Sequence, residues 1–514
     1  MFQSIRAWIG YIAMCVGMFM AILDIQVVAS SLTNIQHALA IPDNMISWIQ
    51  TAYLMAEVVA IPLTGMLTRA ISLRRMFVAA TAGFTLASIG CSLCTSVEPL
   101  IALRVVQGFC GGMLIPAVFT SVFTILPRRH EIVATTVAGV VAMVAPTVGP
   151  FVGGWLTQTY SWHWIFLINV VPGIFVCLVV GAFLPRGDSD PSLLRRIGYV
   201  TVALTAVFLG TLELLLKEAP PHHWQGNYIQ TLAVITGASG LLAIALCLIR
   251  PHAFLNLRRF GRRDFAAGCI LSFVAGMGLY GSTYILAIFL GAVRNHTPIE
   301  IGKIIMVSGA VQLIAAPLAA LLESRINGRV MVAFGYGLFG IGLLLNAHMT
   351  YQTDYDGLFW PQVLRGIAVM FCILPTTRLA MEGWPLSEAP DASGQFNLMR
   401  NLGGAIGIAL IDTIVEQRTE GHANHIIDRL AAGDPDAALK VGLPVQYFHN
   451  TPMGNVDPMM RAFIEPMVQR AALVDSFNEA WLVIGAIFLL SLATVFFVRG
   501  GKWTPDRNGE RVEA

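Results

Sequence analysis

Several ionisable residues lie inside long apolar segments, where a charge has little water to hydrate it. They are Asp24, Glu57, Arg104, Glu213, Arg365, Arg400 and Asp412. A charged side chain at the centre of a membrane-spanning helix costs at least about 2.5–3.5 kcal/mol on insertion scales, so such residues are candidates for function. A carboxylate in this setting can take up and release protons, because burial favours its neutral form and a nearby cation its charged form. Reversible proton binding is therefore the chemistry that these residues indicate.

The four carboxylates differ in their expected depth. Asp24 and Glu57 are the first candidates for a coupling proton, with Glu57 nearer the middle of its segment. Two simpler interpretations stay open: Asp24 as a hydrated residue in the outer third of its segment, and Glu57 as part of a purely structural ion pair. Asp412 is a third candidate that lies close enough to an end to reach the surface. Glu213 is expected to reach the surface.

The three arginines are candidates for the cation that a proton-binding site needs. Arg104 is expected to switch partners as a carboxylate gains or loses its proton. Its alternative is to extend along its helix to the membrane surface, because a long side chain near a helix end can do so. Arg365 and Arg400 are expected to be cations of a central cavity or of the same switch.

The segments that must position these residues are membrane-spanning helices. Of the 514 residues, 56% are hydrophobic and only 12% are charged, against about 25% charged in soluble domains. The mean hydropathy is +0.69, and apolar runs of about 20 residues, each enough to cross a bilayer, recur along the chain. They predict fourteen spans, at about 8–31, 46–67, 76–96, 99–123, 131–156, 162–184, 197–216, 229–249, 265–291, 300–322, 329–349, 358–380, 396–415 and 480–498. The first span is too long for a signal peptide.

The distribution of arginine and lysine predicts the orientation. Alternate loops are rich in arginine, namely Arg69, Arg74, Arg75, Arg128, Arg129, Arg186, Arg195, Arg196, Arg250, Arg258, Arg259, Arg262, Arg263, Arg325 and Arg329. The opposite short loops hold little more than Lys217, Arg294 and Lys303. Because basic loops stay in the cytoplasm, we expect both termini to be cytoplasmic and the long loop at about 416–479 to lie outside.

Composition also argues against other kinds of site. A net charge of +2 gives no electrostatic basis for binding nucleic acid. The eight cysteines all lie in apolar runs, so a disulfide framework is not expected, and Cys91 and Cys94 are interpreted as packing residues. His422 and His425 in the long loop have no further ligands nearby, so we expect them to be solvated and no metal to bind.

A weak internal repeat relates the two ends of the chain. The second span ends AIPLTGMLTRAISLRR (60–75) and the tenth AAPLAALLESRINGR (315–329). The fourth reads LRVVQGFCGGMLIP (103–116) and the twelfth LRGIAVMFCILP (364–375), and GPFVGG (149–154) pairs with GGAIG (403–407). The matches keep their order eight helices apart, as in a parallel repeat of two six-helix halves. This predicts halves at 1–184 and 265–514, with two inserted spans at 185–264.

Five segments resemble motifs of one family. They are LDIQVVASSL (23–32), LRVVQGFCGGMLIP (103–116), VAPTVGPFVGGWL (144–156), WHWIFLINVVPG (162–173) and NLMRNLGGAIGIAL (397–410). Together they resemble the fourteen-helix drug:proton antiporters of the major facilitator superfamily, the EmrB-like multidrug exporters. The likeness covers nearly the whole chain.

That resemblance implies an all-α polytopic fold of two six-helix halves plus two inserted helices. It implies proton-coupled efflux of amphipathic organic compounds or drugs across the inner membrane by alternating access, with the proton gradient as energy source and no cofactor. It also implies a periplasmic membrane-fusion adaptor and an outer-membrane channel as partners, and it assigns Gln107 and Gly108 to the fourth-helix motif.

The glycines and prolines of the fifth span concern conformational change. Gly149, Gly153 and Gly154 have spacings that allow close helix packing, and Pro146 and Pro150 each remove a backbone hydrogen bond; together they suit a helix at a moving junction.

The cytoplasmic turn after the second span departs from its family pattern. It keeps Gly65 and Arg74 but has Arg69 where an acid is usual. The charge relay that the family builds on that acid is therefore not expected here.

The alternatives are an importer or facilitator of a small metabolite, and a membrane-embedded enzyme or sensor. The GPFVGG segment is typical of antiporters and argues against the first. No acid-rich, zinc-protease or serine-hydrolase motif is present, so we expect no enzyme.

Overall fold

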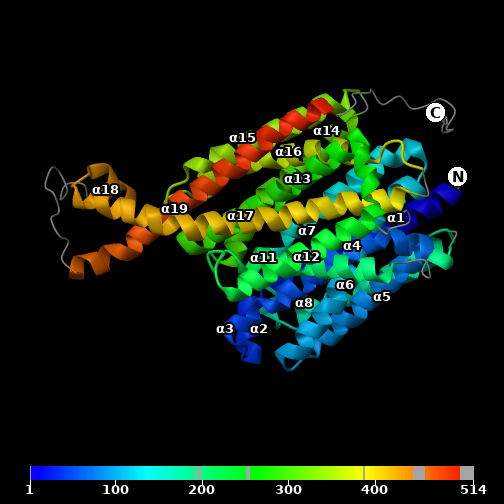
Figure 1. Ribbon diagram of the computed structural model, residues 1–514, viewed down its shortest axis with the longest axis horizontal. Coiled ribbons are helices and arrows are strands. Elements are labelled where there is room, and N and C mark those ends of the chain that lie inside the picture. The colour runs from blue at the N-terminus through cyan, green and yellow to red at the C-terminus, as the bar shows by residue number, and fades with distance from the viewer. Residues whose placement is uncertain are drawn as a thin grey trace.

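The protein is described here by a computed structural model covering residues 2–187, 189–193, 198–249, 255–323, 325–385, 388–443 and 458–497. Within these ranges every regular element is a helix, as expected where lipid offers no hydrogen bonds to the backbone. The long helices run side by side along the longest dimension of the molecule (Figure 1). Arg195, Arg196 and Arg250, on which part of the orientation argument depends, lie outside the described residues.

The first part of the chain forms one bundle around its own apolar core. The helices are α1 (Phe2–Ala29), α4 (Trp48–Ile71), α5 (Leu73–Ser92), α6 (Val97–Thr124), α7 (Glu131–Thr159), α8 (Trp164–Leu167) and α9 (Val170–Phe183). Two short helices, α2 (Leu32–Leu39) and α3 (Asp43–Ile46), connect α1 to α4. The buried residues of this core run from Ala7 to Leu184.

A second bundle follows with a separate core, from Ala267 to Val495. Its helices are α13 (Arg263–Ile288), α14 (Pro298–Glu323), α15 (Gly328–Leu345), α16 (Tyr355–Met381), α17 (Ala389–Ala431) and α19 (Pro458–Ser491). One π-helical turn, η3 (Phe289–Val293), ends α13, and a 3-10 turn, η6 (Leu492–Phe497), ends α19. The two bundles meet mainly where α7 contacts α14 and where α17 contacts α4 and α6.

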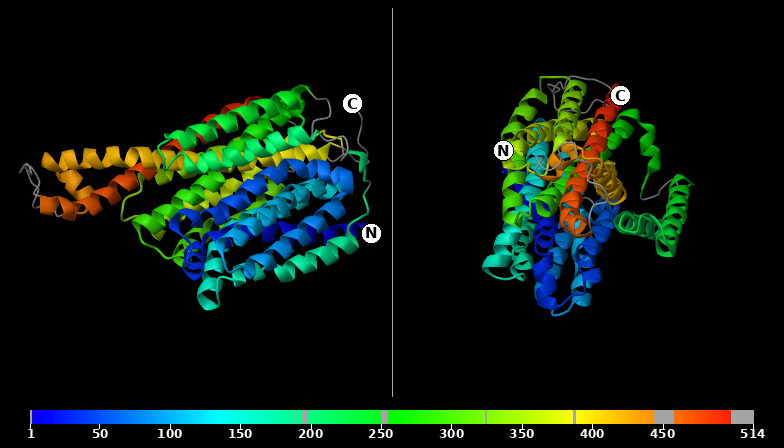
Figure 2. Two further views of the ribbon diagram at one scale, coloured as in Figure 1. Left: turned by 60° about the horizontal axis from the view of Figure 1, so that its bottom comes forward. Right: turned by 90° about the vertical axis from the view of Figure 1, so that its left-hand side faces the viewer.

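Two helices lie between the bundles in sequence and at their edge in space (Figure 2). α11 (Tyr199–Glu218) and α12 (Asn227–Ile249) form a pair, and α11 contacts α4 of the first bundle and α17 of the second. A 3-10 turn, η2 (Leu257–Gly261), leads from α12 towards α13.

Thirteen of the described helices are long and apolar enough to cross a membrane. The remaining predicted span, 76–96, corresponds to α5, a helix of 20 residues that begins with two arginines. The span predicted at 162–184 is divided, because the helical segments α8 and α9 are separated at Ile168 and Asn169.

The prediction of a long loop at 416–479 is wrong, because the described residues of this segment are mostly helical. α17 is 43 residues long and continues from the bundle to Ala431. α18 (Pro435–Val441) follows, and α19 begins at Pro458 and passes through Pro466 without a break. The helices pair through a small apolar cluster of their own, including Ile426, Ala438 and Val468. This helical arm, residues 416–443 and 458–479, projects beyond the end of the bundle opposite to the start of α1 (Figure 1).

Candidate functional site

An ion pair with no access to solvent lies at the centre of the first bundle. Arg104 Nη1 on α6 lies 2.5 Å from Asp24 Oδ2 on α1, and the side chains are completely buried. The interpretations of Asp24 as hydrated and of Arg104 as extending to the membrane surface are therefore both wrong. A buried pair of this kind loses much of its stability if either charge is removed.

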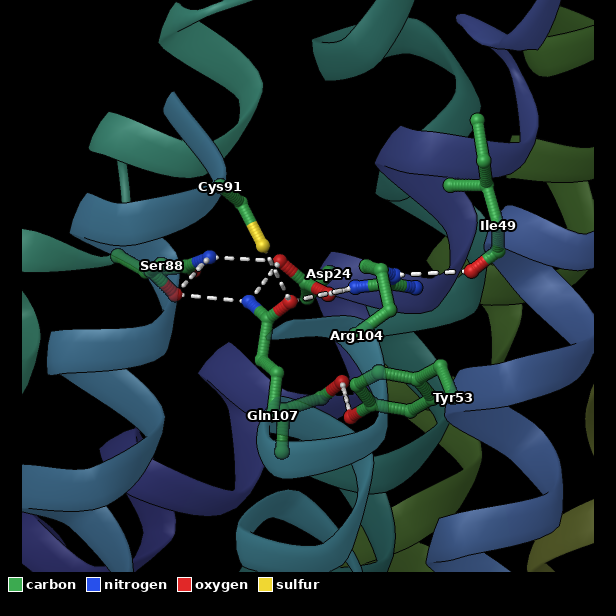
Figure 3. A network of polar contacts seen from close by, with 9 residues as sticks. Asp24, Ile49, Tyr53, Ser88, Cys91, Arg104 and Gln107 are labelled. Atoms are coloured by element: carbon green, nitrogen blue, oxygen red, sulfur yellow. Dashed lines mark hydrogen bonds and ion pairs between the residues drawn. The ribbon is translucent and has the colours of Figure 1, made fainter. Parts of the chain in front are cut away.

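Side-chain amides complete the surroundings of Asp24 (Figure 3). Gln107 Nε2 donates to Asp24 Oδ1 at 3.0 Å and to Ser88 Oγ at 2.7 Å. Asn169 Nδ2 donates to the same carboxylate oxygen at 2.7 Å. Sequence reasoning missed Ser88 and Asn169. Asn169 lies within the quoted WHWIFLINVVPG segment, and a lone polar residue in that apolar stretch was the available signal.

The guanidinium of Arg104 is enclosed on its remaining sides. Its Nε donates to the carbonyl of Ile49 at 3.1 Å, and the Tyr53 ring lies 4.2 Å from its central carbon. The other terminal nitrogen, Nη2, is buried and has no hydrogen-bond partner among the described residues. Gly108 allows this packing, because a Cβ there would lie 2.2 Å from the Tyr53 carbonyl oxygen.

Glu57 is a second buried acid, with different surroundings. It is 5% exposed, and it makes no hydrogen bond or ion pair with any described residue. Its charge interacts with that of Glu213 on α11. Glu213, which was expected to reach the surface, is partly exposed. The neighbouring contact of Lys217 Nζ with Thr51 Oγ1 fixes the same register of α11 on α4.

The ionisable residues of the second bundle are not gathered into one network. Arg365 on α16 donates to the hydroxyls of Ser282 and Ser308, both at 3.1 Å. Asp412 accepts a hydrogen bond of 2.7 Å from the Tyr284 hydroxyl. Arg400 is 6% exposed and makes no hydrogen bond to a described residue.

Comparison with known proteins assigns this architecture to a family. A family model described as "Major Facilitator Superfamily" matches residues 14–408. The chain belongs to the major facilitator superfamily. The resemblance and the all-α fold predicted from the sequence are thereby confirmed.

Relatives of this chain include proteins named for drug resistance or multidrug export. The colistin resistance protein EmrB of Acinetobacter baumannii is 35% identical over 505 residues, which are 98% of both chains. The multidrug export protein EmrB of Escherichia coli (strain K12) is 27% identical over 491 residues, 95% of this chain and 94% of the relative. The structure of the proton:xylose symporter XylE aligns with a TM-score of 0.60 at 11% identity, over 99% of this chain and 98% of that one, which supports the fold alone.

The glycine- and proline-rich motif lies at the junction of the two major facilitator halves. On one face of α7, a Cβ at Gly149 would lie 2.3 Å from Gln26 Cβ, and one at Gly153 would lie 2.7 Å from the Val27 carbonyl oxygen. On another face, Thr147 Cγ2 would lie 2.6 Å from a Cβ on Gly309 of α14. Gly154 is buried, and Pro146 and Pro150 lie within one continuous helix. The motif therefore lets α7 pack closely between α1 and α14.

The turn between α4 and α5 lacks the acid of the family pattern, but an acid of the other half lies beside it. Arg69 Nη2 lies 2.7 Å from Asp391 Oδ2 at the start of α17, and Arg259 Nη2 lies 3.0 Å from the same oxygen. A Cβ at Gly65 would lie 2.7 Å from Asp391 Cα. Arg74 takes no part: its Nη1 donates to the Leu184 carbonyl at 3.4 Å. Sequence reasoning missed Asp391, since nothing local showed that α17 begins beside this turn.

The helical arm holds its own ion pairs. Arg418 pairs with Glu479 at 2.9 Å, and Lys440 pairs with Asp475 at 2.6 Å. His422, expected to be solvated, is 3.3 Å from Glu479. No group of residues suited to hold a metal ion occurs among the described residues.

Proposed function

We propose that this major facilitator protein exports amphipathic organic compounds in exchange for protons by alternating access. The observation that carries the proposal is the sealed Asp24–Arg104 pair with its two amide donors. It combines a carboxylate that can be protonated with a cation that depends on it. The drug-exporting relatives support the direction of transport.

Protonation of Asp24 removes the counter-charge of Arg104. An uncompensated charge in so dry a place costs several kcal/mol, so protonation favours any conformation in which Arg104 is better solvated. α1 carries both Asp24 and Gln26, and Gln26 packs against Gly149 of α7. A shift of α1 would therefore reach α7 and, through Thr147 and Gly309, the other half.

Glu57 is the second proton candidate in this proposal. The charge of Glu57 interacts with those of Glu213 on α11 and Arg104 on α6, and α11 packs against α4. Two neighbouring carboxylates at a dry site cannot both ionise readily. Protonation at this pair is thus a further step by which the chain can respond to a pH gradient.

The test is counter-transport in proteoliposomes with an imposed pH gradient. A panel of cationic, neutral and acidic compounds identifies transported substrates, and a protonophore serves as control. We expect accumulation of at least one compound that collapses with the gradient. Glu57→Gln, compared with Thr51→Ser on the same helix, then shows whether Glu57 contributes. Transport that is unaffected by the protonophore for every compound would contradict proton coupling and favour a facilitator.

We further propose that the chain lies in a bacterial inner membrane with its termini in the cytoplasm. Leu439 in the arm is 65% exposed, and Gly261 before α13 is also exposed. An impermeant thiol reagent applied from outside should label Leu439→Cys and spare Gly261→Cys. The reverse pattern would invert the orientation.

The helical arm is proposed as the contact for a periplasmic membrane-fusion adaptor that continues to an outer-membrane channel. It projects beyond the bundle (Figure 1), and it carries exposed apolar residues, with Leu439 at 65% and Phe463 at 70% exposure. Replacing residues 433–457 by a flexible linker leaves the Arg418–Glu479 pairing in place. It should abolish efflux by cells while sparing transport in proteoliposomes. Equal losses in both assays would assign the arm to the exporter's own folding.

A further inference from the structure

Arg400 differs from every other buried arginine among the described residues. Four arginines are less than a tenth exposed: Arg104, Arg259, Arg365 and Arg400. The first two pair with carboxylates, and Arg365 is bound by two hydroxyls. Arg400 makes no hydrogen bond and no ion pair with a described residue. Its Nε is completely enclosed and without a partner.

An unpaired charge at this depth raises the free energy of the folded protein, and a ligand of opposite charge would lower it. A buried charge whose partner is missing is strongly unfavourable, and Arg400 has no partner among the described residues. A guanidinium does not lose its proton at accessible pH values, so the cost cannot be relieved by neutralisation. A bound anion supplies the missing charge, and a carboxylate can accept two parallel hydrogen bonds from the guanidinium fork.

The surroundings of Arg400 are aromatic and come from both halves. The Phe119 ring on α6 lies 5.5 Å from the guanidinium carbon, and the Phe396 ring on α17 lies 5.3 Å from it. Both rings are 1% exposed. Tyr280 on α13 interacts electrostatically with Arg400 and also with Glu57. An anion here therefore has apolar surface next to its charged group and touches both halves of the transporter.

We propose that Arg400, Phe119 and Phe396 bind the anionic group and adjoining apolar body of an amphipathic organic anion, the substrate class of the exporter. This rests on the proposed export function. Because the site joins α6 of one half to α17 of the other, ligand binding changes the relative free energies of the two access states.

The anion site is separate from the Asp24 proton site of the proposed function. Asp24 pairs with Arg104 and not with Arg400. Export of an anion against entry of a proton moves two positive charges inward, so an inside-negative membrane potential also drives it.

The test uses the full chain in nanodiscs of zwitterionic lipid and three probes with one aromatic body: 2-naphthoate, its methyl ester and (2-naphthyl)trimethylammonium. We expect naphthoate to bind at least about tenfold more tightly than the ester, with the cation weakest. Arg400→Lys, which keeps the charge but loses the fork, should reduce this preference several-fold. Arg400→Gln should abolish it. Phe119→Ala should weaken naphthoate and ester equally.

The unfolding temperature of each variant shows whether that variant is folded. Arg400→Gln removes an uncompensated charge, so it should keep or raise the unfolding temperature of the free protein while losing the stabilisation that naphthoate gives the wild type. Arg294→Lys is the control, because Arg294 already pairs with Asp354 before α16, and it should retain the preference. Equal binding of naphthoate and ester by the wild type would overturn the proposal, as would loss of the preference in Arg294→Lys but not in Arg400→Gln.

Further experiments identify the anion and distinguish a failure of this proposal from a failure of the export proposal. If millimolar chloride removes the naphthoate preference completely, the site holds a small inorganic anion and the substrate class is wrong. If Arg400→Gln still exports a cationic compound under a pH gradient, proton-coupled export stands while the substrate class fails. If naphthoate binds through Arg400 but is never moved by the gradient, the site stands and antiport fails.

Discussion

The two halves hold a buried arginine at the same place in the repeat but give it different partners. Arg104 on α6 and Arg365 on α16 follow a leucine in the matching segments of the repeat. Arg104 binds the carboxylate of Asp24 on the first helix of its half. Arg365 binds the hydroxyl of Ser282 on α13, the first helix of the second half, and that of Ser308 on α14.

The difference makes only the first of these two arginines depend on a partner that can bind a proton. A carboxylate changes its charge when it binds a proton, and a serine hydroxyl does not do so at accessible pH values. The net charge around Arg104 can therefore alternate between zero and +1, whereas the surroundings of Arg365 stay at +1. We infer that the Asp24–Arg104 pair responds to protons and that Arg365 provides a fixed positive charge.

The largest effect is expected from neutralising Asp24. Asp24→Asn leaves Arg104 unpaired, so uptake driven by a pH gradient should fall by more than about tenfold and stability by about 3–5 kcal/mol. Asp24→Asn/Arg104→Gln should recover much of the unfolding temperature without recovering the response to the gradient. Both are measured in proteoliposomes and by thermal unfolding. Wild-type gradient dependence in the double variant would remove this pair from the coupling mechanism.

A smaller effect is expected from the serines around Arg365. Hydrogen bonds to a charged group contribute about 1.5–3 kcal/mol each, so Ser282→Ala/Ser308→Ala should lower the unfolding temperature and slow transport. The dependence of the transport rate on the pH gradient should keep its shape, because no titrating group is removed. Ser282→Asp sharpens the comparison: by giving Arg365 a carboxylate, it should add a new pH dependence. An altered gradient dependence in the alanine variant would contradict the proposed difference between the two arginines.

The contact between the halves should respond to Asp391. Asp391→Asn leaves Arg69 and Arg259 close together without their shared anion, so the end of α4 and the start of α17 should separate more often. Ser393 on α17, 1% exposed and bound to the Pro116 carbonyl of α6, reports on this. Ser393→Cys should react with a permeant thiol reagent about 3–10 times faster in the Asp391→Asn background. Glu388 pairs with Arg259 alone, so Glu388→Gln should change the labelling rate less. Equal labelling rates of Ser393→Cys in the wild-type, Asp391→Asn and Glu388→Gln backgrounds would argue that Asp391 does not hold the two halves together.

The smallest effect concerns an ion cluster in the connection before α16 of the second half. Burial opposes ionisation of Asp354, but hydrogen bonds from Arg294, His296 and the Tyr355 N–H lower its pKa to about 2. Its stabilising effect is therefore complete above the unfolded pKa of about 3.9 and is lost as pH falls towards 2. Since the carboxylate is 37% exposed, the gain is small. Asp354→Asn should lower the unfolding temperature slightly at pH 7, and the difference from wild type should shrink between pH 4 and pH 2; a constant difference would exclude this linkage.

Much of the fold followed from composition and periodicity. Apolar runs long enough to cross a bilayer predict helices because the backbone has no other way to satisfy its hydrogen bonds in lipid. Every predicted span corresponds to described helices. The prediction of a loop at 416–479 was wrong because it depended on hydropathy, the same property that predicted the spans correctly. Once α17 and α19 leave the lipid they become polar, and hydropathy cannot distinguish a helix in water from a loop.

The sequence by itself determined that Asp24, Glu57, Arg104, Arg365 and Arg400 lie among membrane helices, because the apolar runs around them admit no other placement. Only the tertiary structure decided their partners. Asp24 is 80 residues from Arg104 and 145 from Asn169, while Arg69 meets an acid more than 300 residues away at Asp391. Contacts across such distances depend on the rotation and register of packed helices. A run of apolar residues does not encode these, since small residues such as Gly65 and Gly149 allow close approach without naming the partner.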